Sequence, residues 1–471
     1  MPEPRQDALR QVPSIDSLLQ DPELAECAKN VPRTVLLWAL RAAASEVRER
    51  LAAGKTGCGA GMNVREAVLT VAKKNLDSAL GPHYCKAINA TGIILHTGLG
   101  RAVLPERALR RIQSELTGYS VLQLSTETGT RSRRDERIAW LLQQLTGAES
   151  ATVVNNNAAA TLLVLHALAK GREVVVSRGQ LVEIGGSFRL PDVMAQSGAK
   201  LVEVGTTNKT HARDYENAIN ENTAAILRVH PSNYRIQGFT AEVPLEGLEQ
   251  IAHQRGLLLI DDLGAGALID FSRFGFEREP LLAESVRAGA DVITCSGDKL
   301  IGSSQAGLIL GKAALLEKIR KDPLARMVRA GKLTLSVLEA TLECFLEEGT
   351  AMREVPTLRM LARPLADLDR QAGQMAQAIQ QRAPGASAAV IDGFSQMGSG
   401  SLPGQDLPTR LVAISHPSIK PEELSRRLRG SKPPVFARIQ QDQLLIDPRT
   451  LLGGEDTIAI EAIIHALAQS A

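Results

Sequence analysis

The chain has 471 residues, of which 44% are hydrophobic and 23% are charged, enough for two or three hydrophobic cores. Its formal net charge of +2 gives no general attraction to DNA or to a membrane surface, and 3% aromatic residues argue against a base-stacking platform for single strands. The N-terminus has no apolar signal core, and no apolar run approaches the ~20 residues that span a bilayer, so we expect a cytoplasmic protein.

The first 60 residues are expected to form a small helical domain. Ser14 can cap a short helix over residues 15–19, Asp21 opens another turn, and residues 35–51 carry apolar side chains at helical spacing. The glycine-dense stretch 54–61 then interrupts the pattern, which indicates a hinge before the rest of the chain.

A linker and a large α/β domain are expected over residues 61–345. From about residue 148, helical stretches alternate with short β-branched runs at 151–154, 173–177, 200–205, 224–230, 257–262, 291–296 and 306–311. This alternation predicts a mostly parallel sheet flanked by helices, in which ligands bind beyond the carboxyl ends of the strands.

A smaller α+β domain is expected over residues 346–471, after a helical stretch near residues 334–348. Two segments, 409–415 and 434–447, have the alternation of strands, and the segment 457–469 has the spacing of a closing helix.

Lys299 is the first candidate catalytic residue. It follows the run Ser296-Gly297-Asp298, just beyond a buried strand and before a Gly/Ser turn. A lysine in that setting is partly desolvated, which favours the neutral amine that forms a Schiff base. Because a lysine in a Gly/Ser turn is more often a surface residue, the assignment depends on its context.

Asp262 supplies part of that context, since it ends a strand that runs into a glycine turn. An aspartate there can keep the pyridine nitrogen of pyridoxal phosphate (PLP) protonated, and at ~3 Å and an effective dielectric of ~20 the pair attracts by roughly 5 kcal/mol before desolvation. A helix-capping aspartate is the alternative.

Three asparagines, Asn155, Asn156 and Asn157, stand between a strand and an alanine-rich helix. Free N–H groups and the helix dipole favour a phosphate at such a position, although an Asn-rich turn is often purely structural. The chain order of a strand, a phosphate-binding asparagine turn, an aspartate at a strand end and a lysine at a strand end predicts a PLP site.

Several arginines could bind anions: Arg101, Arg131, Arg133, Arg134, Arg326 and Arg329. A spacing of three puts Arg326 and Arg329 on one helix face, where they can grip one anion; a solvated charged face is the alternative. We expect no metal site, because neither the histidines nor the cysteines show metal-ligand spacing, and we expect reduced thiols at Cys27, Cys58, Cys85, Cys295 and Cys344.

Long strings of this sequence resemble the bacterial selenocysteine synthases, the L-seryl-tRNA(Sec) selenium transferases. The strings include INATGIILHTGLGRA, VVNNNAAA, HPSNYRIQGFT and SGDKLIGSSQAGLILGK, and shorter matches such as ALRQVPSIDSLL and SQMGSGSLP extend the resemblance to nearly the whole chain.

The resemblance implies a PLP-dependent transferase of fold type I, similar to aspartate aminotransferase, with a small helical N-terminal domain and an α+β C-terminal domain. It implies catalytic roles for Lys299 and Asp262, and cofactor contacts from Lys299, Asp262, Asn156, Asn157, Ala158, Ser296 and Gln180. It also implies that Arg101, Arg326 and Arg329 surround the substrate and its selenium donor.

The activity implied is conversion of L-seryl-tRNA(Sec) to L-selenocysteinyl-tRNA(Sec) with selenophosphate, through a PLP-bound aminoacrylyl intermediate. Lys299, once released from the cofactor, is the acid-base candidate. The resemblance further implies that the helical head binds the tRNA and that the protein forms a homo-oligomeric ring, a decamer built from dimers.

Some positions depart from the family pattern: Gly98, Gln180, Ala265, Ala267, Ser303, Ser304 and Gly331. They leave open a diverged PLP lyase or transferase that acts on a small amino acid, although the helical head argues for tRNA. A non-catalytic tRNA-binding or scaffolding protein is a third hypothesis, which the presence of Lys299, Asp262 and the asparagine turn together argues against.

Overall fold

The computed structural model describes residues 11–22, 24, 29, 31–53, 63–185 and 188–468. The glycine-rich stretch 54–61, where the sequence predicts a hinge, lies outside the described residues. The chain divides into two compact units, Met1–Lys86 and Ala87–Ala471.

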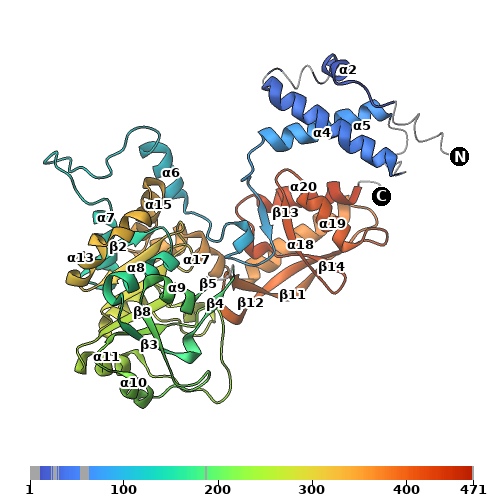
Figure 1. Ribbon diagram of the computed structural model, residues 1–471. Coiled ribbons are helices and arrows are strands. Elements are labelled where there is room, and N and C mark those ends of the chain that lie inside the picture. The colour runs from blue at the N-terminus through green and yellow to red at the C-terminus, as the bar shows by residue number, and fades with distance from the viewer. Residues whose placement is uncertain are drawn as a thin grey trace. The chain divides into compact units, whose positions relative to one another are not determined.

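The first unit is helical (Figure 1), and its described helices are α2 (Ile15–Leu19), α4 (Arg33–Ala52) and α5 (Val64–Leu80). Ser14 caps α2, as expected: its hydroxyl oxygen accepts a hydrogen bond from the N–H of Ser17 at 3.2 Å. Leu40 of α4 and Val68 of α5 are fully buried in one apolar cluster. Because this packing joins α5 to α4, the helical unit ends at Lys86 rather than at residue 60.

A seven-stranded sheet forms the centre of the large α/β domain (Figure 1). Its strand order is β2-β10-β9-β8-β7-β3-β6, and it is parallel except for β10, which runs antiparallel to both neighbours. All seven strands predicted from the sequence are present: β2 (Ser150–Val154), β3 (Glu173–Ser177), β6 (Lys200–Val204), β7 (Thr223–Val229), β8 (Leu258–Gly264), β9 (Val292–Ser296) and β10 (Gly307–Gly311).

Helices cover both faces of this sheet, so most of its strand residues are buried. Alternate strand residues enter two separate apolar clusters: Leu308 and Leu310 face one, and Ile309 faces the other. The first cluster contains side chains of α7 (Glu136–Thr146), α11 (Leu245–Gln254), α12 (Leu282–Arg287) and α15 (Lys332–Cys344). The second contains side chains of α8 (Asn157–Ala169), α9 (Leu190–Ser197) and α13 (Ala313–Lys321).

Shorter elements complete the large domain. They are α6 (Glu106–Glu115), α10 (Ala212–Ala218), α14 (Pro323–Met327), α16 (Glu348–Glu354), α17 (Pro356–Leu361), the two-stranded β4 (Glu183–Ile184) and β5 (Phe188–Arg189), and the 3-10 turns η1 (Thr97–Leu99), η2 (Arg178–Gln180) and η3 (Phe271–Phe274).

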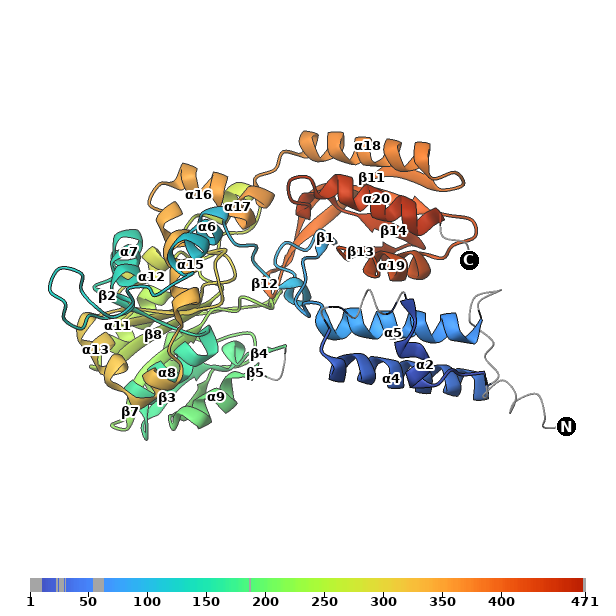
Figure 2. The same cartoon turned by 90° about the horizontal axis from the view of Figure 1, so that it is seen from above.

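The C-terminal part forms the smaller α+β domain that the sequence predicts (Figure 2). Its five-stranded sheet has the order β1-β13-β14-β12-β11. Its elements are β11 (Ser387–Gly398), β12 (Ser401–Ser415), β13 (Val435–Gln440), β14 (Gln443–Ile446), α18 (Leu365–Arg382), α19 (Pro421–Arg429), α20 (Glu455–Ala468) and η4 (Pro448–Thr450).

One strand of this smaller sheet comes from far upstream. β1 (Ile88–Ala90) pairs in parallel with β13, although the sequence assigned residues 61–345 to the linker and the large domain. Ile88 and Ala90 are fully buried in the apolar cluster of the smaller domain, which explains the crossing. The chain therefore passes from the small sheet directly into the segment that leads to Arg101.

No helix in the described part of the chain is long and apolar enough to cross a membrane.

Candidate active site

Lys299 lies in a cavity at the carboxyl ends of the central parallel strands. It follows β9 within three residues and is only 6% exposed. The cavity has a volume of about 270 Å³ and is lined by Lys299 together with Asp262, Ser296, Asp298, Arg101, Asn156, Asn157, Ala158, His230, Ser232, Asn233 and Gln305, among others. Seven of the sequence-predicted site residues are therefore brought together here.

The surroundings of Lys299 favour its neutral amine. Burial lowers the pKa of Lys299 below its ordinary value, and the positive charge of Arg101 lowers it further, while Asp298 and Asp262 act in the opposite direction. A neutral amine is the form that attacks a carbonyl, so the cavity prepares this lysine for covalent attachment of an aldehyde.

Asp262 lies on β8 between the neighbouring strands β7 and β9, where its Cα pairs with those of Val229 and Thr294. Its Oδ1 accepts hydrogen bonds from Asn157 Nδ2 at 2.9 Å and from Gly264 N at 3.0 Å, and its Oδ2 accepts one from the Thr161 hydroxyl at 2.9 Å.

Burial raises the pKa of the Asp262 carboxyl, against the lowering effect of these hydrogen bonds. A cation beside the carboxylate would restore its charged form. The protonated ring nitrogen of PLP is a cation that fits this position.

The N-terminus of α8 also opens into the cavity, with Asn156, Asn157 and Ala158 on its wall. Asn156 is the N-cap, and its Oδ1 accepts from Ala159 N at 2.9 Å. Asn157 Oδ1 is buried and has no hydrogen-bond partner among the described residues, so the turn retains acceptor capacity for a ligand. Free N–H groups at the start of a 13-residue helix suit a phosphate.

Arg101 reaches the cavity from the turn after η1. Its backbone is left-handed, with φ of +63°, and Gly100 before it has φ of +94°. Arg101 Nη1 donates to Asp298 Oδ2 at 2.8 Å, so an arginine is fixed beside the residue that precedes Lys299. A non-glycine residue in this region is strained, and such strain persists where the surrounding structure holds it.

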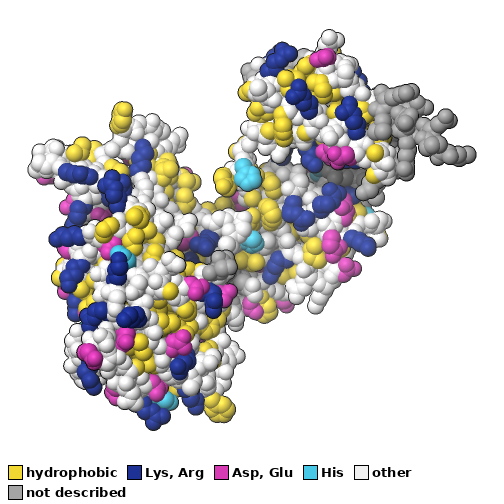
Figure 3. Space-filling view, viewed as in Figure 1, with side chains coloured by type: hydrophobic (Ala, Val, Ile, Leu, Met, Phe, Trp, Pro, Cys, Tyr) yellow, Lys and Arg dark blue, Asp and Glu magenta, His cyan; other side chains and the backbone are white. Residues whose placement is uncertain are grey.

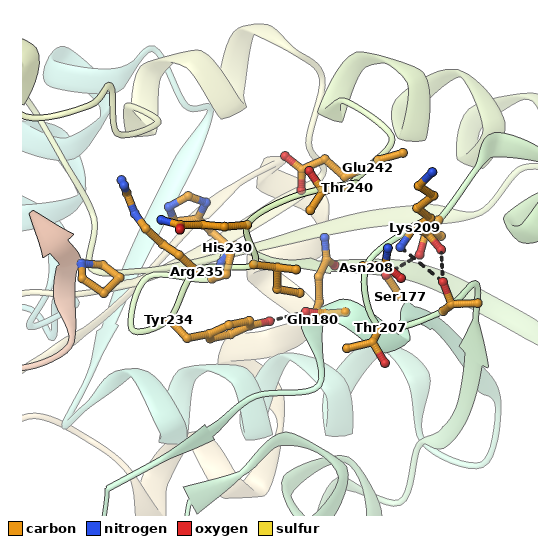
Figure 4. A pocket seen from close by; sticks show the side chains of 18 of the residues that line it. Ser177, Gln180, Thr207, Asn208, Lys209, His230, Tyr234, Arg235, Thr240 and Glu242 are labelled. Carbon is orange, nitrogen blue, oxygen red and sulfur yellow. Dashed lines mark hydrogen bonds between the residues drawn. The ribbon is translucent and has the colours of Figure 1, made fainter.

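Three predicted site residues lie elsewhere. Gln180 lines a neighbouring hollow of about 400 Å³ (Figure 4), where its Oε1 accepts from Val229 N at 3.1 Å. Arg326 and Arg329 line a different hollow together with Arg134. The prediction that they share a helix face is wrong, because α14 ends at Met327 and Arg329 lies beyond it in a backbone bridge to Val154. The single chain does not bring these three residues to Lys299.

Sequence reasoning did not single out His230, which lines both the Lys299 cavity and the hollow of Figure 4. Its Nε2 lies 3.0 Å from Oε2 of Glu279, a buried carboxylate. His230 directly follows β7, and its N–H donates to Asp262 O at 2.8 Å. The rule that ligands bind at strand ends could have identified it within the string HPSNYRIQGFT.

The departures from the family pattern lie outside the cavity wall. None of Gly98, Gln180, Ala265, Ala267, Ser303, Ser304 and Gly331 lines the part of the Lys299 cavity that the structure describes. The Ser303 hydroxyl donates to Thr341 Oγ1 at 3.1 Å, and the Ser304 hydroxyl donates to Thr334 O at 3.1 Å. These serines therefore serve packing and hydrogen bonding behind the site.

A mostly parallel sheet, a buried lysine beyond β9 and a buried aspartate on β8 together define a PLP-dependent enzyme of fold type I. Residues 87–452 match the family model described as L-seryl-tRNA selenium transferase, and residues 9–48 match the one described as selenocysteine synthase N terminal. The chain belongs to the L-seryl-tRNA selenium transferase family, which confirms the resemblance seen in the sequence strings and PLP as the cofactor.

Similar proteins match over nearly their full length. The L-seryl-tRNA(Sec) selenium transferase of Alkaliphilus metalliredigens is 42% identical over 97% of this chain and 98% of its own length. The L-seryl-tRNA(Sec) selenium transferase of Geobacter sulfurreducens is 44% identical over 96% of this chain and 98% of its own length. Among solved structures, D-glucosaminate-6-phosphate ammonia-lyase is 22% identical, with a TM-score of 0.57 over 83% of this chain and 98% of that one, which confirms the fold.

Proposed function

We propose that the protein converts L-seryl-tRNA(Sec) to L-selenocysteinyl-tRNA(Sec), with selenophosphate as the selenium donor, in the cytoplasm. One observation carries this proposal: in a chain of this family, the Lys299 cavity combines a buried lysine, a buried aspartate and an ion-paired arginine, and none of its described lining residues departs from the family pattern.

The cavity residues suit the cofactor in specific ways. Lys299 would hold PLP covalently, Asp262 would pair with its ring nitrogen, and the α8 N-terminus at Asn156–Ala158 would receive its phosphate, with Ser296 beside it. Bound PLP supplies an electron sink that stabilises negative charge at the α-carbon of the seryl group.

The protein side chains then divide the remaining work. Lys299 Nζ removes the α-proton of the seryl group, because its pKa is lowered by burial and by Arg101. Arg101 attracts the selenophosphate anion, and Asp298 orients its guanidinium through the 2.8 Å hydrogen bond.

We propose that the helical unit binds the tRNA. On α4, Trp38, Arg41 and Arg48 are exposed, and Trp38 is 53% exposed. Their helical spacing puts the three side chains on one face of the helix. Lys and Arg side chains are also visible on the surface of this unit in Figure 3. Arginines bind phosphates, and an exposed indole can stack on a base, so this face suits an RNA backbone.

We also propose a homo-oligomer, a decamer built from dimers. The segment between α6 and α7 exposes Tyr119, Val121 and Leu124, and the segment after β7 exposes Phe239. Large apolar side chains exposed in this way are typical of subunit contacts. A second copy could also bring Arg326 and Arg329 to an active site that a single chain leaves without them.

A substrate comparison tests the proposed function. Purified protein is incubated with PLP, selenophosphate and either seryl-tRNA(Sec) or another seryl-tRNA, and the aminoacyl group is identified after release from the tRNA. Conversion confined to seryl-tRNA(Sec) is expected. No conversion by protein that retains PLP absorbance would reject the proposal and favour the alternative, a diverged lyase or transferase acting on a small amino acid.

A further inference from the structure

The tip of the β11–β12 hairpin reaches the segment that carries Arg101. The Ser399 hydroxyl donates to Leu95 O at 2.6 Å and lies 2.9 Å from the Thr97 hydroxyl. Because a hydroxyl has one proton, and that of Ser399 goes to Leu95, the Thr97 hydroxyl is the donor toward Ser399. Leu95 N donates in turn to Met397 O at 2.7 Å.

This segment forms a closed turn that ends at Arg101. Arg101 N donates to His96 O at 3.0 Å, across η1, and the Arg101 side chain then binds Asp298. The turn is therefore anchored at its start by Ser399 and at its end by the residue before Lys299. Its left-handed Arg101 backbone needs such anchors, because an unrestrained arginine would leave that conformation.

The hairpin tip itself has little room to move. A Cβ on Gly398 would lie 2.4 Å from Ile93 Cγ2, and one on Gly400 would lie 2.7 Å from Cβ of Asn233, which lines the Lys299 cavity. Ser399, between these glycines, has φ of +53° and is itself strained. The string SQMGSGSLP thus encodes a tightly packed contact between the smaller domain and the active-site turn.

We infer that this tip is a positioning element for the active site, and that Ser399 is the positioning residue that sets Arg101 toward the anionic selenium donor. The inference rests on the proposed role of Arg101 in binding that anion. It gives the smaller domain a part in binding the selenium donor. Two hydrogen bonds at Ser399 fix the turn that ends at Arg101, whose cationic side chain lines the cavity.

Ser399→Gly tests the inference, with Ser401→Ala as a matched control. Glycine adopts a positive φ without strain, so the variant loses the Ser399 hydroxyl while the backbone conformation stays accessible. Ser401 is two residues away, and its buried hydroxyl makes no hydrogen bond to any described residue, so Ser401→Ala removes the same group without touching the turn.

Two readouts are measured on the full-length protein. The first is the set of steady-state constants for selenophosphate with PLP bound, and the second is the pH midpoint for PLP attachment to cofactor-free protein, followed by an absorbance titration. For Ser399→Gly we expect the KM for selenophosphate to rise roughly tenfold, which corresponds to about 1.4 kcal/mol, and kcat to change less than KM does. The midpoint for PLP attachment should move to higher pH, because a loosened turn weakens the hold on Arg101, whose charge lowers the pKa of the free Lys299 amine. Ser401→Ala should match the unmodified protein in both readouts.

Wild-type constants and titration in Ser399→Gly would overturn the inference, as would equal changes in Ser401→Ala. A Thr97→Val change should add little to Ser399→Gly, since both remove the same contact; additive effects would also count against it. If the unmodified protein does not use selenophosphate, the proposed function fails, but the absorbance titration still decides whether Ser399 positions Arg101.

Discussion

Replacing Asp262 by asparagine would remove one negative charge from the Lys299 cavity and change little else. The amide oxygen can keep the hydrogen bonds from Asn157 and Gly264, both of which reach Oδ1. The Thr161 hydroxyl, which donates to Oδ2, can instead donate to Asn157 O at 3.1 Å and accept from the new amide. We therefore expect the fold to survive this change.

In cofactor-free protein, the same change should not reduce stability at neutral pH. Burial raises the pKa of Asp262 above its ordinary value of 3.8, so the folded state binds the proton more tightly than the unfolded state. The resulting stability is present below pH 3.8 and is lost as pH rises through the raised pKa. Urea unfolding at several pH values measures this loss in the unmodified protein and its absence in Asp262→Asn. A variant less stable by more than about 1 kcal/mol would refute this reasoning.

With PLP bound, Asp262→Asn should be harmful, because the lost carboxylate no longer pairs with the ring nitrogen of the cofactor. A carboxylate and a pyridinium at ~3 Å attract by roughly 5 kcal/mol at an effective dielectric of ~20, and desolvation offsets part of this. We expect kcat/KM for selenium transfer to fall at least ~100-fold, or about 2.7 kcal/mol, in Asp262→Asn assayed at saturating PLP. Activity within about threefold of the unmodified protein would show that Asp262 does not tune the cofactor.

Lys299, Arg101 and two arginines of α4 can be tested in the same way. Lys299→Ala should abolish the visible absorbance of bound PLP while circular dichroism stays unchanged; undiminished absorbance would exclude this lysine as the anchor. In Arg101→Gln, the pKa of Lys299 should rise, so the midpoint for PLP attachment to cofactor-free protein should move to higher pH; an unmoved midpoint contradicts the electrostatic role. Reversing both Arg41 and Arg48 to glutamate should weaken tRNA binding at least about tenfold in a filter-binding assay and spare PLP absorbance; equal affinity would move recognition off this face of α4.

Most of the fold could be predicted from the sequence because the central strands are short apolar runs buried on both faces. β1 could not, since three residues carry no periodic pattern and its partner β13 lies far along the chain. The end of the helical unit was misplaced at residue 60 because the glycine-dense stretch resembles a domain boundary. The apolar face of α5 packs on α4 beyond it.

The sequence allowed prediction of those site residues whose positions depend only on the order of the strands. Lys299, Asp262 and the α8 N-terminus meet because parallel strands place their carboxyl ends at one edge. The direction of a side chain after a strand depends on the local turn, so Gln180 faces a neighbouring hollow and bonds Val229 instead. A glutamate at this position would offer the same acceptor oxygen to Val229 N.

If the Lys299 cavity is the PLP site, the cofactor can be trapped on this lysine. The purified protein is reduced with borohydride to make the bond between cofactor and lysine permanent, then digested and analysed by peptide mass spectrometry. We predict a phosphopyridoxyl group on the peptide that contains Lys299. Modification of another lysine, or of none, would show that Lys299 does not hold the cofactor.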